Sequence, residues 1–150
     1  MDPIVLIRVV AGFFCFFALV VAILYLVTLS TTLAKCSENA RTMDPGLVWL
    51  LLIPIFNLMW HFFVVQAVAK SLGAEFRARN IYSDEPNPGK SGGVAMCVCG
   101  ACVLIPLLNV LIMVPYLVLW VMYWNRIAGY SRLLDHRPAV DVMPQSTQIA

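Results

Sequence analysis

Residues 9–34 read VVAGFFCFFALVVAILYLVTLSTTLA and contain no Asp, Glu, Lys or Arg. A helix of roughly 20 apolar residues already crosses the ~30 Å hydrocarbon core of a bilayer. A membrane-spanning strand would alternate apolar and polar side chains, whereas VVAIL at residues 20–24 is apolar at every position. This stretch therefore predicts a membrane-spanning α-helix.

Two further stretches, residues 45–69 and 91–125, also lack charged side chains. In the whole chain of 150 residues, 61% are hydrophobic and 12% are charged, whereas soluble domains carry about 25% charged residues. These features predict an all-α fold, an integral membrane helical bundle in the cell membrane. The net charge of +2 is too small to indicate nucleic-acid binding, which needs a concentrated basic surface.

The first stretch could instead belong to a cleaved export signal, because residues 33–36, LAKC, are similar to a lipoprotein cleavage site. Two features argue against cleavage. The apolar run is much longer than the ~7–15 residues of a signal peptide, and Lys35 stands where a small residue is normally found. We therefore interpret the stretch as a retained anchor.

The third stretch decides the number of spans. One helix over residues 91–125 would be about 52 Å long, which is too long for a comfortable crossing. A split near residues 106–109 gives two short spans, and one long kinked third helix, for three spans in all, is the alternative. We predict four transmembrane helices, at about residues 3–28, 45–70, 91–106 and 108–126, within a helical domain of residues 1–137. Residues 138–150 are expected to form a short, polar, disordered tail.

Basic residues orient these helices, because cytoplasmic loops are rich in Lys and Arg. With four crossings and an internal N-terminus, seven of the nine basic residues in the loops and C-terminal segment lie inside the cell. With three crossings, only four of them do. We therefore predict that both termini and the loop over residues 70–90 are cytoplasmic.

A short internal repeat links the second and third stretches. LIPIFNL at residues 52–58 resembles LIPLLNV at residues 104–110. Parallel repeats occur in transport proteins, but chance or a shared device for breaking a helix also accounts for seven residues. The sequence leaves both interpretations open.

Three segments carry a resemblance to a known group of proteins. They are MDPGLVW at residues 43–49, IPIFNLMW at residues 53–60 and YWNRIAGYSR at residues 123–132. The chain resembles, over roughly residues 36–133, a group of small uncharacterised bacterial multi-spanning membrane proteins. The resemblance implies a membrane protein of the bacterial inner membrane and adds no site residues.

Three polar side chains are expected at membrane depth, namely Asn57, His61 and Asn109. Asn57 and His61 are four residues apart, so they share one face of a helix. We expect both to point into the bundle, with Asn109 close to Asn57. Such groups either hold helices together or mark a pathway, and the sequence favours neither strongly enough to exclude the other.

The cysteine cluster and one glycine-rich segment suggest chemistry that the spacing does not support. Cys97, Cys99 and Cys102 could bind a soft metal, but Cys97 and Cys99 point about 200° apart on a helix, and cysteine also packs as a small apolar residue. GKS at residues 89–91 is similar to the end of a phosphate-binding loop, but Asp84 stands where that pattern needs Gly. We predict packing cysteines, no cofactor, no metal and no nucleotide.

Several other residues have simple structural interpretations. Trp120, Tyr123 and Trp124 are expected to form an aromatic belt at the membrane interface. Arg8 is expected to extend to the lipid headgroups, and Cys15 to lie in the core.

The sequence contains no Ser, His and acid arrangement of the kind that supports nucleophilic catalysis. We therefore expect a non-enzymatic membrane protein that acts by assembly, as a subunit or scaffold. Its expected partners are the lipid bilayer and either a second copy or another membrane protein. The alternative is a small transporter or channel component with a polar path near Asn57, His61 and Asn109.

Overall fold

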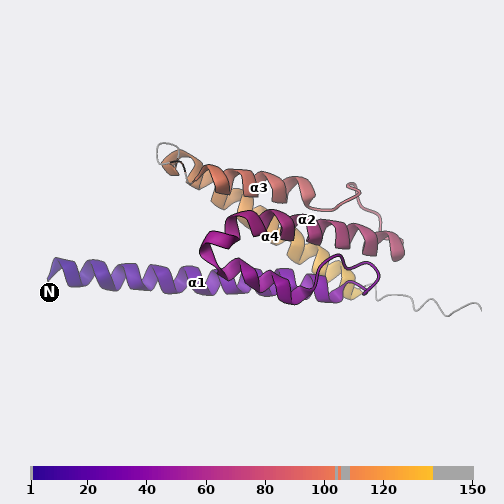
Figure 1. Ribbon diagram of the computed structural model, residues 1–150, viewed down its shortest axis with the longest axis horizontal. Coiled ribbons are helices and arrows are strands. Elements are labelled where there is room, and N and C mark those ends of the chain that lie inside the picture. Colours follow the sequence, from indigo (N-terminus) through magenta and orange to yellow (C-terminus); the bar gives the residue numbers. More distant parts are fainter. Residues whose placement is uncertain (1, 104, 106–108, 137–150) are drawn as a thin grey trace, which may run out of the picture.

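The computed structural model describes residues 2–103, 105 and 109–136, and their fold is all-α. The described ranges contain helices and no strand. In chain order the elements are α1 (Pro3–Lys35), the 3₁₀-helix η1 (Pro45–Leu52), α2 (Pro54–Ala78), α3 (Lys90–Cys102) and α4 (Asn109–His136) (Figure 1). The predicted fold class is confirmed at this level. The predicted tail and the predicted break at Pro106 lie outside the described residues.

The helix α1 is longer than predicted, because it ends at Lys35 rather than near Thr28. Pro3 occupies its first turn, where a missing N–H costs little. The hydroxyl of Thr32 donates to the carbonyl of Thr28 at 2.6 Å, so this polar residue is accommodated within the helix. Residues 2–20 are all exposed, and Figure 1 shows this part of α1 extending alone beyond the other helices.

The prediction of one continuous helix over residues 45–70 is wrong. The chain forms η1, leaves the helical conformation at Ile53 with a ψ of 110°, and starts α2 at Pro54. Proline lacks an N–H and also disfavours the helical conformation in the residue before it. The predicted start is confirmed, since the carboxylate of Asp44 accepts a backbone N–H at 2.7 Å.

The elements η1 and α2 pack against each other and form the first pair (residues 45–78). The indole Nε1 of Trp60 in α2 donates to the carbonyl of Leu47 in η1 at 2.9 Å. The hydroxyl of Thr42 donates to the carbonyl of Ala67 at 3.0 Å, which ties the preceding loop to α2. The first pair therefore has both of its ends on the same side of the molecule.

The helices α3 and α4 form the second pair (residues 90–136). They are separate helices that pack side by side, so one long helix over residues 91–125 does not form. Gly93 lies beside Tyr123 and Gly100 beside Tyr116, which makes the two helices antiparallel. The second pair, like the first, returns to the side from which it starts.

The C-terminal ends of α1, α2 and α4 meet at one end of the molecule. Trp124 donates to the hydroxyl of Thr28 at 2.9 Å, and Lys35 pairs with Asp135 at 2.7 Å, so α1 and α4 run in parallel. We call residues 35–44, 75–90 and 126–136 together the charged end.

This arrangement corrects the predicted sidedness. Four crossings would place the loop after α1 opposite the loop after α2, yet Ser37 donates to the carboxylate of Glu75 at 2.7 Å. Arg79 also donates to the carbonyl of Lys35 at 3.0 Å. The error arose because residues 45–70 were counted as one crossing, whereas η1 and α2 fold back on each other.

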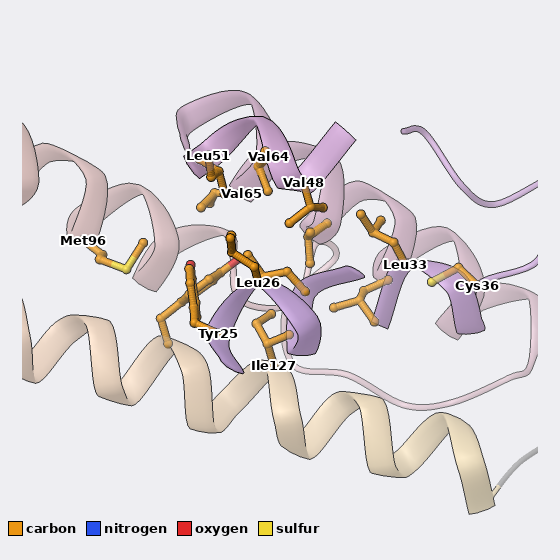
Figure 2. Packing of buried hydrophobic residues seen from close by; sticks show 14 of the residues in the cluster. Tyr25, Leu26, Leu33, Cys36, Val48, Leu51, Val64, Val65, Met96 and Ile127 are labelled. Atoms are coloured by element: carbon orange, nitrogen blue, oxygen red, sulfur yellow. The ribbon is translucent and has the colours of Figure 1, made fainter. Parts of the chain in front are cut away.

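The core fills the space between the C-terminal half of α1 and the two pairs. Leu29 and Leu33 of α1 are completely buried, as are Val65 of α2, Met96 of α3 and Ile127 of α4. Figure 2 shows Leu33, Val65, Met96 and Ile127 with other side chains of this cluster. Every long helix therefore contributes to one core, and the first two thirds of α1 contribute nothing to it.

Two helices in the described chain are long and apolar enough to cross a membrane, Pro3–Lys35 and Leu111–His136. Only 11% of the residues in the apolar window of each are buried, which is unlike the core helix of a soluble protein. The helix α3 has 13 residues, or about 20 Å of length. The prediction of four crossing helices is therefore not confirmed.

Candidate functional site

A cavity of about 170 Å³ lies between α1, η1, α2 and α4. Its walls combine aliphatic side chains and aromatic rings with the polar side chains of Asn57 and His61 from α2. The residues that line it are Ala22, Tyr25, Leu26, Leu51, Leu52, Asn57, His61, Tyr116 and Trp120. Two of the three polar residues singled out from the sequence therefore line one cavity.

A hydrogen bond between α1 and α2 forms one wall of this cavity. The hydroxyl of Tyr25 and Nε2 of His61 are 3.0 Å apart. The Tyr25 side chain is buried, and its ring centroid lies 5.3 Å from that of Trp120 and 6.0 Å from that of Trp124. Packing of these rings fixes the tyrosine hydroxyl where the imidazole can reach it.

Asn57 lines the cavity and also carries a buried hydrogen-bond acceptor that is not paired. It lies at the start of α2, where its backbone N–H donates to the carbonyl of Ile53 at 2.8 Å. Its side-chain Oδ1 atom is buried and has no hydrogen-bond partner. A buried acceptor left in this condition costs about 1–3 kcal/mol. The expectation that Asn57 and His61 face the protein rather than lipid agrees with these positions.

Asn109 does not line this cavity. It is half-buried at the start of α4, and its backbone N–H donates to the carbonyl of Ile105 at 3.0 Å. Asn57 has the same kind of backbone hydrogen bond, to Ile53. The two asparagines occupy equivalent places in the two pairs and do not share this cavity.

The predicted aromatic belt is wrong. Tyr123 is buried, and Trp120 and Trp124 pack against the buried core. Trp124 also donates to Thr28 across the interface with α1. These rings point inward because α1 runs beside α4 at this level. The position of the rings before Arg126 in the sequence could not indicate that a neighbouring helix covers them.

Tyr25 is the site residue that the sequence analysis missed. It lies inside an apolar stretch of α1, where a tyrosine resembles any other large apolar residue. The available signal was its phenolic hydroxyl, because a buried hydroxyl usually has a partner. His61 is that partner, and it lies 36 residues away in sequence.

The cysteines are distributed through the fold. Cys97 is buried and Cys99 and Cys102 are half-buried, and the described residues contain no group of three His, Cys, Asp or Glu side chains suited to a metal ion. Cys15, which we expected in the core, is exposed, because the part of α1 that carries it has no neighbouring helix. Cys36 is buried and directs its thiol to the carbonyl of Thr32 at 3.5 Å.

A second polar cluster lies at the charged end. The carboxylate of Glu75 is almost fully buried and accepts both the N–H and the hydroxyl of Ser37, at 2.9 and 2.7 Å. Arg79 pairs with Glu75 at 2.6 Å and donates to the carbonyl of Leu134 at 2.9 Å. This cluster joins α1, α2 and α4, and its contacts are those of a structural clamp.

Comparison of the chain with protein-family models, with curated proteins and with solved structures finds no match. The geometry of the described residues is therefore what indicates a function. That geometry combines a long exposed apolar helix with a small cavity that presents hydrogen-bonding groups between aromatic walls.

Proposed function

We propose that this chain is a non-enzymatic integral membrane protein, that α1 anchors it in the bilayer, and that it acts by assembling with a second copy of itself. The observation that carries the proposal is the uncovered apolar surface of α1. From Ile4 to Leu24 this helix presents large apolar side chains on every side, for example Phe13 and Phe16, each 67% exposed. A continuous apolar surface of this size requires lipid or another protein around it.

In the proposed placement α1 crosses the membrane and both pairs enter it from the charged end. The shorter helix of each pair supports this placement. The helix η1 has eight residues and α3 has 13, which correspond to about 16 Å and 20 Å of helix. Both are shorter than the ~30 Å apolar core of a bilayer. All described Lys and Arg residues except Arg8 lie in or next to the charged end, which favours a cytoplasmic charged end and an external N-terminus.

One face of α1 suits contact with a second copy. Leu29 and Leu33 lie on the face that packs against the rest of the chain. The same face continues towards the N-terminus through the small residues Ala11, Cys15 and Ala18, because these positions repeat with helical spacing. Small residues allow membrane helices to approach closely, and a symmetric dimer brings identical residues together.

Oxidative cross-linking in membranes tests this assembly. A variant that keeps Cys15 and carries Ala at the other four cysteines should form a disulfide-linked dimer, because Cys15 would face its own copy across the two-fold axis. The matched control moves the cysteine to the opposite face of α1 with Cys15→Ala and Phe17→Cys, and it should stay monomeric. Membrane-inserted protein that cross-links at neither position would refute self-association through α1.

Transport is the second candidate function, and the cavity at Asn57 and His61 is the observation that favours it. In this alternative the protein is a small transporter or channel component, and these side chains form part of a polar path. Proteoliposomes would then show a flux of small uncharged solutes that Asn57→Leu abolishes without unfolding the protein. An equal flux in the two proteins would remove this candidate.

A further inference from the structure

A second cavity, of about 280 Å³, lies at the charged end between the end of α2, the loop that follows it and α4. A cavity of about 150 Å³ accommodates benzene in another protein, so this one has room for about ten heavy atoms. Three aromatic rings and three charged side chains line it, which are Phe76, Tyr82 and Tyr130 together with Asp84, Glu85 and Arg126. It therefore differs from the cavity at Asn57 and His61, which no charged side chain lines.

The three rings give this second cavity aromatic walls. The ring centroids of Phe76 and Tyr130 are 5.5 Å apart and their planes are inclined at 85°, so the two rings form adjacent walls at nearly a right angle. Tyr82 is 88% exposed, so the surface of its ring is free to contact a ligand. The face of an aromatic ring attracts cations, and several rings around one space are the usual recognition site for a quaternary ammonium group.

The charged side chains of the cavity leave one negative charge uncompensated. The carboxylate of Glu85 accepts the N–H of Gly89 at 3.2 Å and the hydroxyl of Ser91 at 3.0 Å. The guanidinium of Arg126 also lies 3.8 Å from this carboxylate. Asp84, in contrast, is exposed and forms no hydrogen bond or ion pair with another residue of the described ranges. A ligand with a single positive charge would therefore balance the charge of the lining.

We propose that this cavity binds a compact quaternary ammonium ion, whose methyl groups contact the rings of Tyr82 and Tyr130 and whose charge is balanced by Asp84. Such an ion has no N–H donor, so it needs ring faces and a nearby carboxylate rather than a set of hydrogen-bond acceptors. Two sources share this chemistry: a soluble ion of the choline type, and the headgroup of a choline phospholipid at the membrane surface. The site is independent of self-association through α1, since no residue of α1 lines it.

Choline and its uncharged carbon isostere, in which a tert-butyl group replaces the trimethylammonium group, form the decisive pair of probes. They have the same shape and differ in charge. The full chain is purified in a maltoside detergent, because a phosphocholine detergent would itself occupy the site. Equilibrium dialysis with radiolabelled choline, competed by each unlabelled compound, gives both affinities. We expect choline to bind about 5- to 30-fold more tightly than the isostere, the range given by two cation–π contacts.

Variants of two exposed residues test the walls without threatening the fold. Tyr82→Ala should weaken choline binding about two- to five-fold by removing one ring, whereas Tyr82→Phe keeps the ring and should retain most of the affinity. Asp84→Asn should weaken choline binding by up to about five-fold. Glu38→Gln is the matched control, because it removes an exposed carboxylate from the same end of the molecule without touching the cavity, and it should leave the affinity unchanged.

Three results would overturn the proposal. The first is equal affinity for choline and the isostere, or no saturable binding of either. The second is an unchanged affinity for choline in Tyr82→Ala. The third is tighter binding of ethanolamine than of choline, because a primary ammonium group would then be held through its N–H donors rather than by the rings.

Mixed micelles of the maltoside and a phospholipid separate the two sources. If the site takes a lipid headgroup, phosphatidylcholine should displace radiolabelled choline and phosphatidylglycerol should not. If phosphatidylcholine fails to displace it, the site belongs to a soluble quaternary ammonium ion. Equal displacement by both lipids would refute recognition of the choline group.

Discussion

Glu75 is the most completely buried charged residue described in the chain, with 1% of its side chain exposed. Burial of a carboxylate without partners has a large desolvation cost. Here Arg79 and Ser37 supply the hydrogen bonds of the carboxylate. A second ion pair joins Lys35 of α1 to Asp135 of α4, and its side chains are 34% and 52% exposed. It lies beside the first, because Arg79 donates to the carbonyls of Lys35 and Leu134. These two ion pairs therefore allow a buried ion pair to be compared with an exposed ion pair in the same cluster.

Glu75→Gln should lower the free energy of unfolding by about 3–5 kcal/mol, because it removes the charge of one partner from a buried ion pair. Asp135→Asn is the matched control and should cost at most about 1 kcal/mol, as is usual for an exposed pair. Denaturant unfolding of both variants in the same detergent measures the difference. Equal losses in the two variants would show that Glu75 does not act as a buried partner.

The same carboxylate should make the protein sensitive to acid. Burial alone would raise the pKa of Glu75, but the hydrogen bonds from Ser37 and Arg79 and the charge of Arg79 lower the pKa below its usual value of 4.5. A carboxyl with a lowered pKa in the folded state contributes stability above its unfolded pKa and loses it as the pH falls through the folded value. The denaturant concentration at the unfolding midpoint should therefore decrease as the pH falls below about 4.5. In Glu75→Gln the midpoint should change less over the same pH range.

Tyr25→Phe tests the hydrogen bond between α1 and α2 while keeping the aromatic packing. We expect a loss of about 0.6–2 kcal/mol in the free energy of unfolding, because Nε2 of His61 remains buried without its partner. Tyr82→Phe is the control, since Tyr82 is 88% exposed. If thermal unfolding in detergent gives the same midpoint for Tyr25→Phe as for the unaltered protein, the bond contributes nothing to the fold.

At the scale of the elements, local sequence predicted much of the fold. The cap at Asp44 follows from a short-range rule, and the separation of α3 from α4 follows from the length of the uncharged run at residues 91–125. The break at Ile53 was also available from those rules, because the residue before proline avoids helical conformations. We missed it because the uncharged run from residue 45 to residue 69 has the length of a single span.

Two neighbouring glycines in α3 should respond in opposite ways to the same substitution. A Cβ atom at Gly93 would collide with Val65 of α2 and lie 2.8 Å from the ring of Tyr123 in α4, whereas a Cβ at Gly92 would meet no atom within 4 Å. Gly93→Ala should therefore cost about 1–3 kcal/mol through overpacking, and Gly92→Ala should gain up to about 1 kcal/mol through helix propensity. Denaturant unfolding measures both, and a stabilising Gly93→Ala would contradict the close packing of α2, α3 and α4.

At the scale of the whole molecule, the direction of α1 relative to α4 could not be derived from local sequence. It depends on contacts such as that between Lys35 and Asp135, which are 100 residues apart. The candidate site has the same origin. Periodicity placed Asn57 and His61 on one face, but the cavity exists only because Tyr25 and Trp120 arrive there from two other helices.

The termini should lie on opposite sides of the membrane if α1 crosses it once, because each pair returns to the charged end. In a background without native cysteines, Asp2→Cys should react with an impermeant thiol reagent in intact cells, and Ser83→Cys, in the loop of the charged end, should react only after the membrane is opened. Ile105→Cys, near the far end of the second pair, should stay unreactive in both conditions, since the pair ends within the apolar core. Reaction of Ile105→Cys in intact cells would mean that the second pair crosses completely. Protection of both Asp2→Cys and Ser83→Cys in intact cells would indicate that both termini are cytoplasmic. It would exclude the parallel arrangement of α1 and α4 within a membrane.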